Sequence, residues 1–221
     1  MLNVSPSCQI KNIVNIYDKY FNLSKSGVFV EIGAYDGESF SNTSCLADIG
    51  WRGVYVEPVQ EFYNKCKKRH EANNVVVLNN SVGSTEEEIK IYVAGCITTT
   101  KLSQLEMYRD VNWLKGRTQR EEKCSQITLE QVLKNNKIVP NFDLLVVDVE
   151  GSEVDVFNSF SLALWRPKML IVELEDTHST FLKYTEHREQ HKDLRKTITE
   201  TGYVEVYKDS INTVFVDENI V

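Results

Sequence analysis

Short apolar runs alternate with longer amphipathic stretches along most of the chain, a pattern that predicts strands alternating with helices. The apolar runs predict strands at 28–32, 53–58, 75–79, 89–94, 142–151, 167–176, 203–207 and 212–217. The amphipathic stretches predict helices at about 9–22, 39–49, 59–71, 101–114, 125–136, 152–160 and 186–201. Helices between consecutive strands favour an α/β fold, in which helices cover both faces of a mostly parallel sheet.

Local signals add detail to this arrangement. Thr128 is a good N-cap for the helix that follows it. Segment 89–94 is expected to pair beside 75–79. Segments 203–207 and 212–217 are separated by a short turn, which predicts a hairpin at the C-terminal end of the fold.

Composition describes an ordinary globular protein, with 42% hydrophobic and 26% charged residues among 221. We expect one domain over residues 1–221, with a helical segment over 1–26, because no repeat or low-complexity stretch divides the chain. The net charge of −7 argues against a nucleic-acid partner, which normally requires a basic face. No apolar run reaches the roughly 18 residues of a membrane span.

Five cysteines, odd in number and without a CxxC pair, predict reduced thiols rather than a disulfide framework or zinc site. The N-terminal stretch lacks a basic start followed by an apolar block, so no signal peptide is expected. Together these features predict a cytoplasmic location.

Acidic side chains stand at the ends of four predicted strands. They are Glu31, Glu57, Asp148 with Glu150, and Glu173 with Glu175. In open α/β sheets, ligands bind beyond the carboxyl ends of the strands, and parallel strands bring those ends to one edge. The sequence therefore predicts an acidic ligand site at that edge.

The first predicted strand runs into a glycine turn with the sequence Gly33-Ala34-Tyr35-Asp36-Gly37. Such a turn lets a ligand approach the backbone. It lacks the middle glycine of the dinucleotide fingerprint, which disfavours a dehydrogenase. A carboxylate at Asp36 would repel a pyrophosphate and attract an ammonium or sulfonium group. The turn therefore favours a nucleoside that carries positive charge.

Glu57 ends the second predicted strand, where an acid about 20 residues beyond the glycine turn commonly accepts both ribose hydroxyls. A solvated loop acid is the alternative. With the glycine turn at the right distance, we favour ribose binding.

Three segments, VFVEIGAYDG, YVEP and LLVVDVEGSEVDVF, resemble the FkbM family of S-adenosylmethionine-dependent methyltransferases. The resemblance covers about residues 27–176, and its most specific part is DVEGSE at 148–153. It implies the class I methyltransferase fold: Rossmann-like and doubly wound, with a mostly parallel seven-stranded sheet and a C-terminal antiparallel hairpin. Residues 95–125 follow no family pattern, and we expect them to be an insertion that covers the substrate.

The resemblance also implies roles for individual residues. Glu31, with the glycine turn, would bind the methionine part of the cofactor, Glu57 the ribose, and Asp148 would lie beside the transferred methyl group. The implied cofactor-binding set is Glu31, Gly33, Ala34, Tyr35, Asp36, Gly37, Glu57, Pro58, Ser81, Val82 and Asp148. Within it, Ser81 and Val82 would contact the adenine.

Methyl transfer to an alcohol needs a general base or a metal, because a neutral hydroxyl is a poor nucleophile. Asp148 and Glu150 leave one strand end two residues apart, and Glu173 ends the neighbouring strand. Asp148 and Glu173 could bind Mg²⁺ or Mn²⁺, which prefer carboxylate oxygens. A metal-free general base is the alternative. His178 is a further candidate base, or else an ordinary loop histidine.

The other histidines carry no clear chemical signal. His187 and His191 have the i, i+4 spacing of a zinc-protease helix, but Arg188 stands where that motif needs Glu. We therefore expect HREQH to be a solvated helix face. His70 lies in the charged run KKRHE and is expected at the surface.

The favoured function is an O-methyltransferase that acts on a hydroxyl of a small polar acceptor. A sugar or glycan is the first choice, because acids can accept many hydroxyl hydrogen bonds and because such acceptors are common in the resembling family. A secondary metabolite such as a polyketide or peptide is the alternative acceptor. A catalytically inactive nucleoside-binding module is the alternative outside enzymes, although its acids would then have no role.

Overall fold

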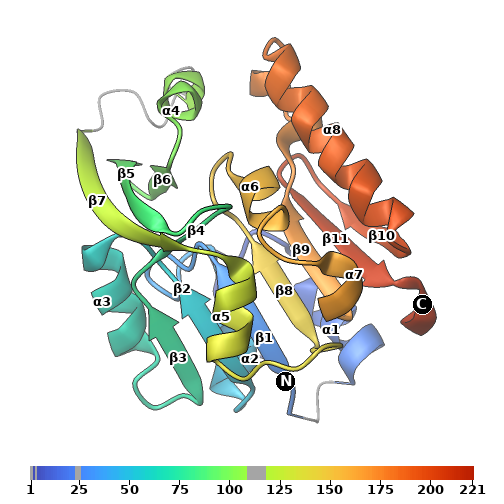
Figure 1. The fold of residues 1–221 in the computed structure, drawn as a ribbon. Coiled ribbons are helices and arrows are strands. Elements are labelled where there is room, and N and C mark those ends of the chain that lie inside the picture. Colours follow the sequence, from blue (N-terminus) through green and yellow to red (C-terminus); the bar gives the residue numbers. More distant parts are fainter. Residues whose placement is uncertain (1, 3, 23–25, 109–117) are drawn as a thin grey trace.

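A seven-stranded sheet forms the centre of the computed structural model, which describes residues 2, 4–22, 26–108 and 118–221 (Figure 1). Its strands lie in the order β10-β11-β9-β8-β1-β2-β3. They are β1 (Val28–Ile32), β2 (Arg52–Val56), β3 (Val75–Leu78), β8 (Leu144–Val147), β9 (Met169–Glu173), β10 (Tyr203–Lys208) and β11 (Asn212–Asp217). Only β11 pairs antiparallel to its neighbours, β9 and β10. The mostly parallel sheet with a C-terminal hairpin confirms the predicted fold.

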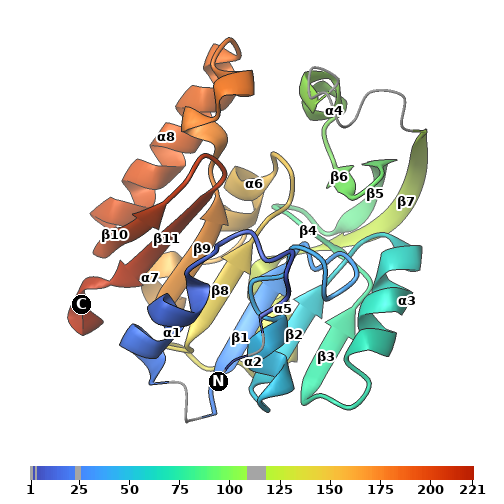
Figure 2. The same ribbon diagram turned by 180° about the vertical axis from the view of Figure 1, so that it is seen from behind.

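Helices cover both faces of this sheet, as Figures 1 and 2 show from opposite sides. One face carries α1 (Ile13–Phe21), α2 (Ser44–Asp48) and α3 (Gln60–Arg69). The other face carries α5 (Leu129–Asn135), α6 (Glu153–Phe157), α7 (Leu162–Trp165) and α8 (Thr185–Glu200).

Alternation along the strands divides the core into two layers. On β1, Phe29 packs with α1 and α2, whereas Val30 and Ile32 pack with the helices of the opposite face. This follows from the two-residue period of a strand, which sends successive side chains to opposite faces. A sheet buried on both faces explains why its central strands are apolar throughout.

Thr128 caps α5 as predicted. Its hydroxyl accepts a hydrogen bond from the Gln131 amide, and the Gln131 side chain accepts one from the Thr128 amide. This capping box satisfies donors that a helix otherwise leaves free in its first turn.

A second sheet of four strands lies beside the N-terminal half of the fold, in the order β4-β7-β5-β6. Its strands are β4 (Ser81–Val82), β5 (Glu87–Ala94), β6 (Ile97–Thr99) and β7 (Gln119–Ile127). The prediction that 89–94 pairs beside 75–79 is wrong. β5 instead pairs antiparallel with β7 along its whole length, from Glu87 opposite Gln126 to Ala94 opposite Gln119. Pairing with β7 gives hydrogen-bond partners to more backbone groups of β5 than pairing with the four-residue β3 could.

The stretch 95–125, expected to cover the substrate, contains β6, α4 (Leu102–Tyr108) and most of β7. α4 and the start of α8 lie at the same end of the molecule, beyond the carboxyl ends of β1, β8 and β9 (Figure 1). The expected helix at 101–114 runs past α4 into residues 109–117, which lie outside the described part of the chain. Among the helices that the structure describes, none is long and apolar enough to cross a membrane.

Candidate active site

A cavity of about 510 Å³ lies at the carboxyl ends of β1, β2, β8 and β9. Its walls come from the segments that follow these strands, from β4 and β6, and from Tyr108 of α4. This is the edge at which α/β sheets bind ligands, and the volume suits one small molecule.

Most of the predicted site residues meet in this cavity. Those that line it are Glu31, Gly33, Ala34, Tyr35, Glu57, Pro58, Ser81, Val82, Asp148, Glu150, Glu173 and His178. Asp36 and Gly37 are not among the lining residues. Asp36 accepts hydrogen bonds from the amides of Glu38 and Ser39, and Gly37 packs against α3. Both residues shape the turn, and neither faces the cavity.

Glycine at position 33 allows the turns after β1 and β8 to touch. Gly33 has a φ of +92°, and a Cβ built there would lie 1.7 Å from the Asp148 carbonyl oxygen. A larger residue would therefore push apart the two segments that carry Glu31 and Asp148. Nearby, Tyr35 adopts a φ of +51°, which lets its amide donate to Glu57 at 2.9 Å.

Glu31 and Glu57 are buried carboxyl groups held by hydrogen bonds. The Glu31 carboxylate accepts hydrogen bonds from the Thr43 and Ser41 hydroxyls, and Glu57 accepts from the amides of Tyr35 and Val59. Burial raises the pKa of each to about 8, and these hydrogen bonds offset it only in part. Each is therefore largely protonated at neutral pH until a positive or hydrogen-bonding ligand favours the ionised form.

Asp148, Glu150 and Glu173, which we call the acid cluster, also line this cavity. One carboxylate oxygen from each lies within 4.8 Å of the others. Burial raises the pKa of Asp148 to about 7, and burial together with neighbouring acids raises the pKa of Glu150 and Glu173. Glu173 Oε2 is buried and has no hydrogen-bond partner among the described residues. Such a cluster can take up a proton or hold a divalent cation.

The cavity is strongly acidic overall. Its acidic lining residues are Glu31, Glu57, Asp148, Glu150, Glu173 and Glu175. None of the described lining residues is Lys or Arg. A low-dielectric cavity with this composition favours cations or neutral polyols and disfavours phosphates and other anions.

His178 lies at the cavity wall, but its geometry does not suit the role of base. Its Nδ1 accepts a hydrogen bond from the Thr180 amide at 3.3 Å, which places the proton of the neutral ring on Nε2. In that form His178 can donate a hydrogen bond from Nε2 but cannot accept a proton there.

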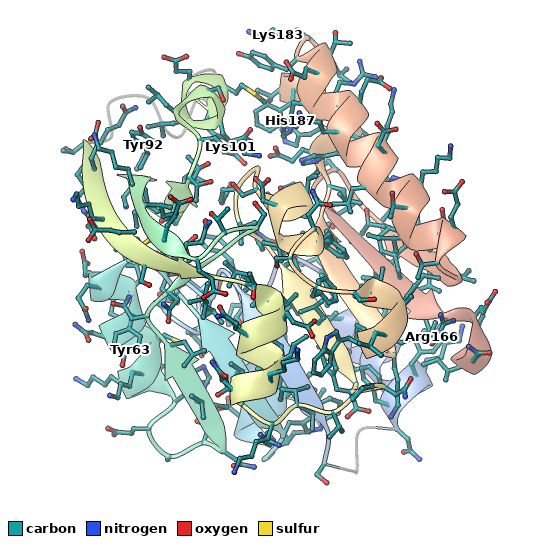
Figure 3. The ribbon with its side chains drawn as sticks, in the orientation of Figure 1. Tyr63, Tyr92, Lys101, Arg166, Lys183 and His187 are labelled. Atoms are coloured by element: carbon teal, nitrogen blue, oxygen red, sulfur yellow. The ribbon has the colours of Figure 1, made fainter. Side chains whose placement is uncertain are left out.

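The predictions for the other histidines are wrong, because all three are buried. Figure 3 shows His187 near the start of α8, and its side chain contacts Glu175. His191, one turn further along α8, contacts Glu153, and both histidines are buried. His70 bonds the Gly37 carbonyl through Nε2 at 2.8 Å and stacks on Tyr55. Each histidine pairs with a group distant in sequence, so local charge pattern could not reveal its burial.

The sequence did not single out Glu175 as a hydrogen-bonding centre. Its carboxylate accepts from the Tyr108 hydroxyl at 3.1 Å and from Gln104 at 3.3 Å, both on α4. His187 Nε2 lies 3.0 Å from the same carboxylate. The sequence showed Glu175 as an acid that follows an apolar strand. Its hydrogen-bond partners on α4 and α8 belong to no sequence motif, so they could not be predicted.

Comparisons with known proteins identify the family and the fold to which the chain is similar. The model of the family described as Methyltransferase FkbM domain matches residues 31–205. No curated protein matches the sequence. Among solved structures, the O-methyltransferase from Bacillus cereus in complex with SAH is similar with a TM-score of 0.53 and 16% identity, over 98% of this chain and 83% of that one.

A provisionally assigned caffeoyl-CoA O-methyltransferase from Staphylococcus aureus has the same TM-score of 0.53 with 12% identity, over 96% of this chain and 86% of that one. At such identities the likeness shows the shared methyltransferase fold. The family match is more specific, because it spans most of the chain and includes the strand ends that carry the acids. The chain therefore belongs to the FkbM family of S-adenosylmethionine-dependent methyltransferases.

Proposed function

We propose that the protein transfers the methyl group of S-adenosylmethionine to a hydroxyl of a small polar acceptor, with a sugar or glycan as the first choice. The observation that carries this proposal is the acidic cavity at the strand ends, whose described lining includes no Lys or Arg. A sulfonium cofactor and a neutral polyol both suit such a cavity. Anionic acceptors do not.

The lining residues divide into two groups for this reaction. Glu31 would pair with the ammonium of the methionine part, and Glu57 would accept the ribose hydroxyls. Ser81 and Val82 would contact the adenine. The acid cluster would then lie at the end of the cavity where the acceptor enters.

Asp148 is the proposed general base. When bound, the cofactor supplies an activated methyl group. Asp148 would orient the acceptor hydroxyl and take its proton as the oxygen bonds to the methyl carbon. The bond between that carbon and the sulfur would break in the same displacement, so that S-adenosylhomocysteine leaves with the sulfur as a neutral thioether. Burial places the pKa of Asp148 at about 7, near the pH at which a base is most useful. Glu150 would hold a second hydroxyl of the same acceptor.

The acid cluster also supports an alternative, in which a divalent cation activates the acceptor oxygen. Asp148, Glu150 and Glu173 offer carboxylate oxygens close together. Among the described residues, Glu173 Oε2 lacks the hydrogen-bond partner that a buried acid normally has. This donor set fits Mg²⁺ or Mn²⁺. The cation would lower the pKa of the acceptor hydroxyl.

Treatment with EDTA separates these two routes. If a cation is required, EDTA should abolish methyl transfer and added Mn²⁺ should restore it. The paramagnetic resonance spectrum of Mn²⁺ should also show binding that Glu173→Gln weakens. Full activity after chelation would exclude the cation from the mechanism and favour Asp148 as the general base.

The acceptor class follows from an acceptor screen. Polyols and sugars are expected to be methylated in preference to polyketide or peptide hydroxyls, because the acid cluster can accept several hydrogen bonds at once.

A reducing, cytoplasmic compartment is part of the same proposal. It rests on the sequence, which has five cysteines, an odd number, and no CxxC pair.

Thermal unfolding with S-adenosylhomocysteine tests the proposed cofactor. At about 100 times its dissociation constant, a ligand adds roughly 2.7 kcal/mol to the free energy of unfolding. For a chain of this size, each kcal/mol added to the free energy of unfolding raises Tm by roughly 2–4 °C. We expect this upward shift with S-adenosylhomocysteine and none with NAD⁺ or buffer alone. An unchanged Tm with S-adenosylhomocysteine would contradict the proposal.

A further inference from the structure

His191 contacts the segments that follow both β8 and β9. Its Nδ1 accepts a hydrogen bond from the Glu175 amide at 2.9 Å, directly after β9. The ring proton therefore lies on Nε2. That nitrogen lies 3.5 Å from Glu153 Oε2, which is longer than an ordinary hydrogen bond and makes the contact mainly electrostatic.

Glu153 in turn holds the turn after β8. Its side chain is fully buried, and its Oε1 accepts hydrogen bonds from the amides of Val149 at 3.1 Å and Gly151 at 3.2 Å. These bonds enclose Glu150, whose φ of +56° lies in the left-handed region that a side chain rarely adopts. Glu153 thus fixes the backbone that presents Asp148 and Glu150.

The other carboxylate oxygen of Glu153, Oε2, has His191 as its electrostatic partner. Glu153 Oε2 makes no hydrogen bond among the described residues. Burial opposes ionisation of Glu153, but the interaction with His191 outweighs it and lowers the pKa of the carboxyl. A buried carboxylate deprived of such a partner is strongly unfavourable, so it would protonate or move. A protonated or displaced Glu153 would hold the two amides less firmly.

We propose that His191 is a positioning residue that fixes the two halves of the acid cluster relative to each other. On one side it holds the backbone after Glu173 through the Glu175 amide. On the other it holds Glu153, and through it the backbone that carries Asp148 and Glu150. The catalytic consequence of this link rests on the proposed methyl transfer, whereas the structural link does not.

Two substitutions each retain one half of the link. His191→Asn keeps an acceptor near the Nδ1 position for the Glu175 amide, and His191→Gln keeps a donor near the Nε2 position for Glu153. We expect either variant to lower kcat by roughly 10–100-fold, because misplacement by about 1 Å can reduce turnover on this order. Binding of S-adenosylhomocysteine should remain within a few-fold, since Glu31 and Glu57 are untouched.

Amide hydrogen exchange provides a readout that does not depend on activity. His191→Asn should accelerate exchange at Val149 and Gly151, and His191→Gln should accelerate it at Glu175. Ile198→Ala is the matched control: Ile198 is buried on the same face of α8, two turns further on, and packs in the core away from the cavity. It should lower stability without changing kcat or exchange at those three amides.

The possible outcomes are distinct. Wild-type kcat in both His191 variants would overturn the catalytic part, and unchanged exchange would overturn the structural link. If the wild-type protein transfers no methyl group, exchange alone decides the link while the proposed function fails. If neither variant folds, ¹⁵N spectra of wild-type His191 decide it: a proton on Nε2 supports the link, and a proton on Nδ1 overturns it.

Discussion

Asp148→Asn is expected to lower methyl transfer by roughly 10²–10⁴-fold, the usual contribution of a general base. Asparagine has nearly the same shape but cannot take a proton, and it would also be a weaker ligand for a cation. Binding of S-adenosylhomocysteine should remain within a few-fold, because Glu31 and Glu57 still line the cavity. Steady-state methylation of an acceptor from the screen, measured beside isothermal titration with S-adenosylhomocysteine, separates these effects.

Asp155→Asn is the matched control for this variant. Asp155 lies only a few residues after Asp148, in the first turn of α6. It forms an ion pair with Lys101 at 2.9 Å and is not among the residues that line the cavity. The same chemical change there should leave methyl transfer within a few-fold of the wild type. Equal activity in both variants would show that Asp148 is not the general base, and Glu150 and Glu173 would then be the candidates for that role.

Without ligands, the protein should become less stable as pH rises from 6 to 8. Burial raises the pKa of Glu31 and Glu57 from 4.5 to about 8, so in this range both are ionised in the unfolded chain and wholly or partly protonated in the folded protein. The unfolded state then binds fewer protons. For each group, the free energy of unfolding falls by roughly 1.4 kcal/mol per pH unit near pH 6 and by about half of that near pH 8. The raised pKa values of the acid cluster act in the same direction.

Urea unfolding at several pH values measures this dependence. Glu31→Gln and Glu57→Gln should each reduce the slope between pH 6 and 8, because glutamine cannot ionise. Other acids oppose the trend only at lower pH. Against desolvation, hydrogen bonds and ion pairs with arginines lower the pKa of Asp48 and Asp176, and hydrogen bonds from the Asn219 amide and from Arg166 lower that of Asp217. The stabilisation from these three acids is therefore lost near and below their usual pKa of 3.8. Constant stability from pH 6 to 8 would show that the two glutamates are already ionised in the empty cavity.

The sequence was sufficient to predict the main sheet and the acidic edge. Strands such as Leu144–Val147 are apolar on both faces, so their burial is visible without knowledge of partners. The acids that end those strands reach the same cavity because parallel strands align their ends. Both features depend on local pattern and on a general rule of topology.

The second sheet and the buried histidines could not be predicted in this way. β7 reads QREEKCSQI, and its polar character reflects a largely exposed strand whose pairing with β5 depends on residues far along the chain. His187 and His191 look solvated beside Arg188 and Glu189. They are buried because Glu153 and Glu175, on other elements, bring acidic partners to them.

An acidic cavity should also influence how the product leaves. Before transfer, the cofactor carries a sulfonium charge in addition to its ammonium and carboxylate, and after transfer that extra charge is gone. Six acidic residues line the cavity, and its described lining contains neither Lys nor Arg, so they attract the charged form more strongly than the spent one. The cavity would therefore bind the by-product S-adenosylhomocysteine less tightly than S-adenosylmethionine. This difference in affinity favours replacement of the by-product by fresh cofactor and limits inhibition as S-adenosylhomocysteine accumulates.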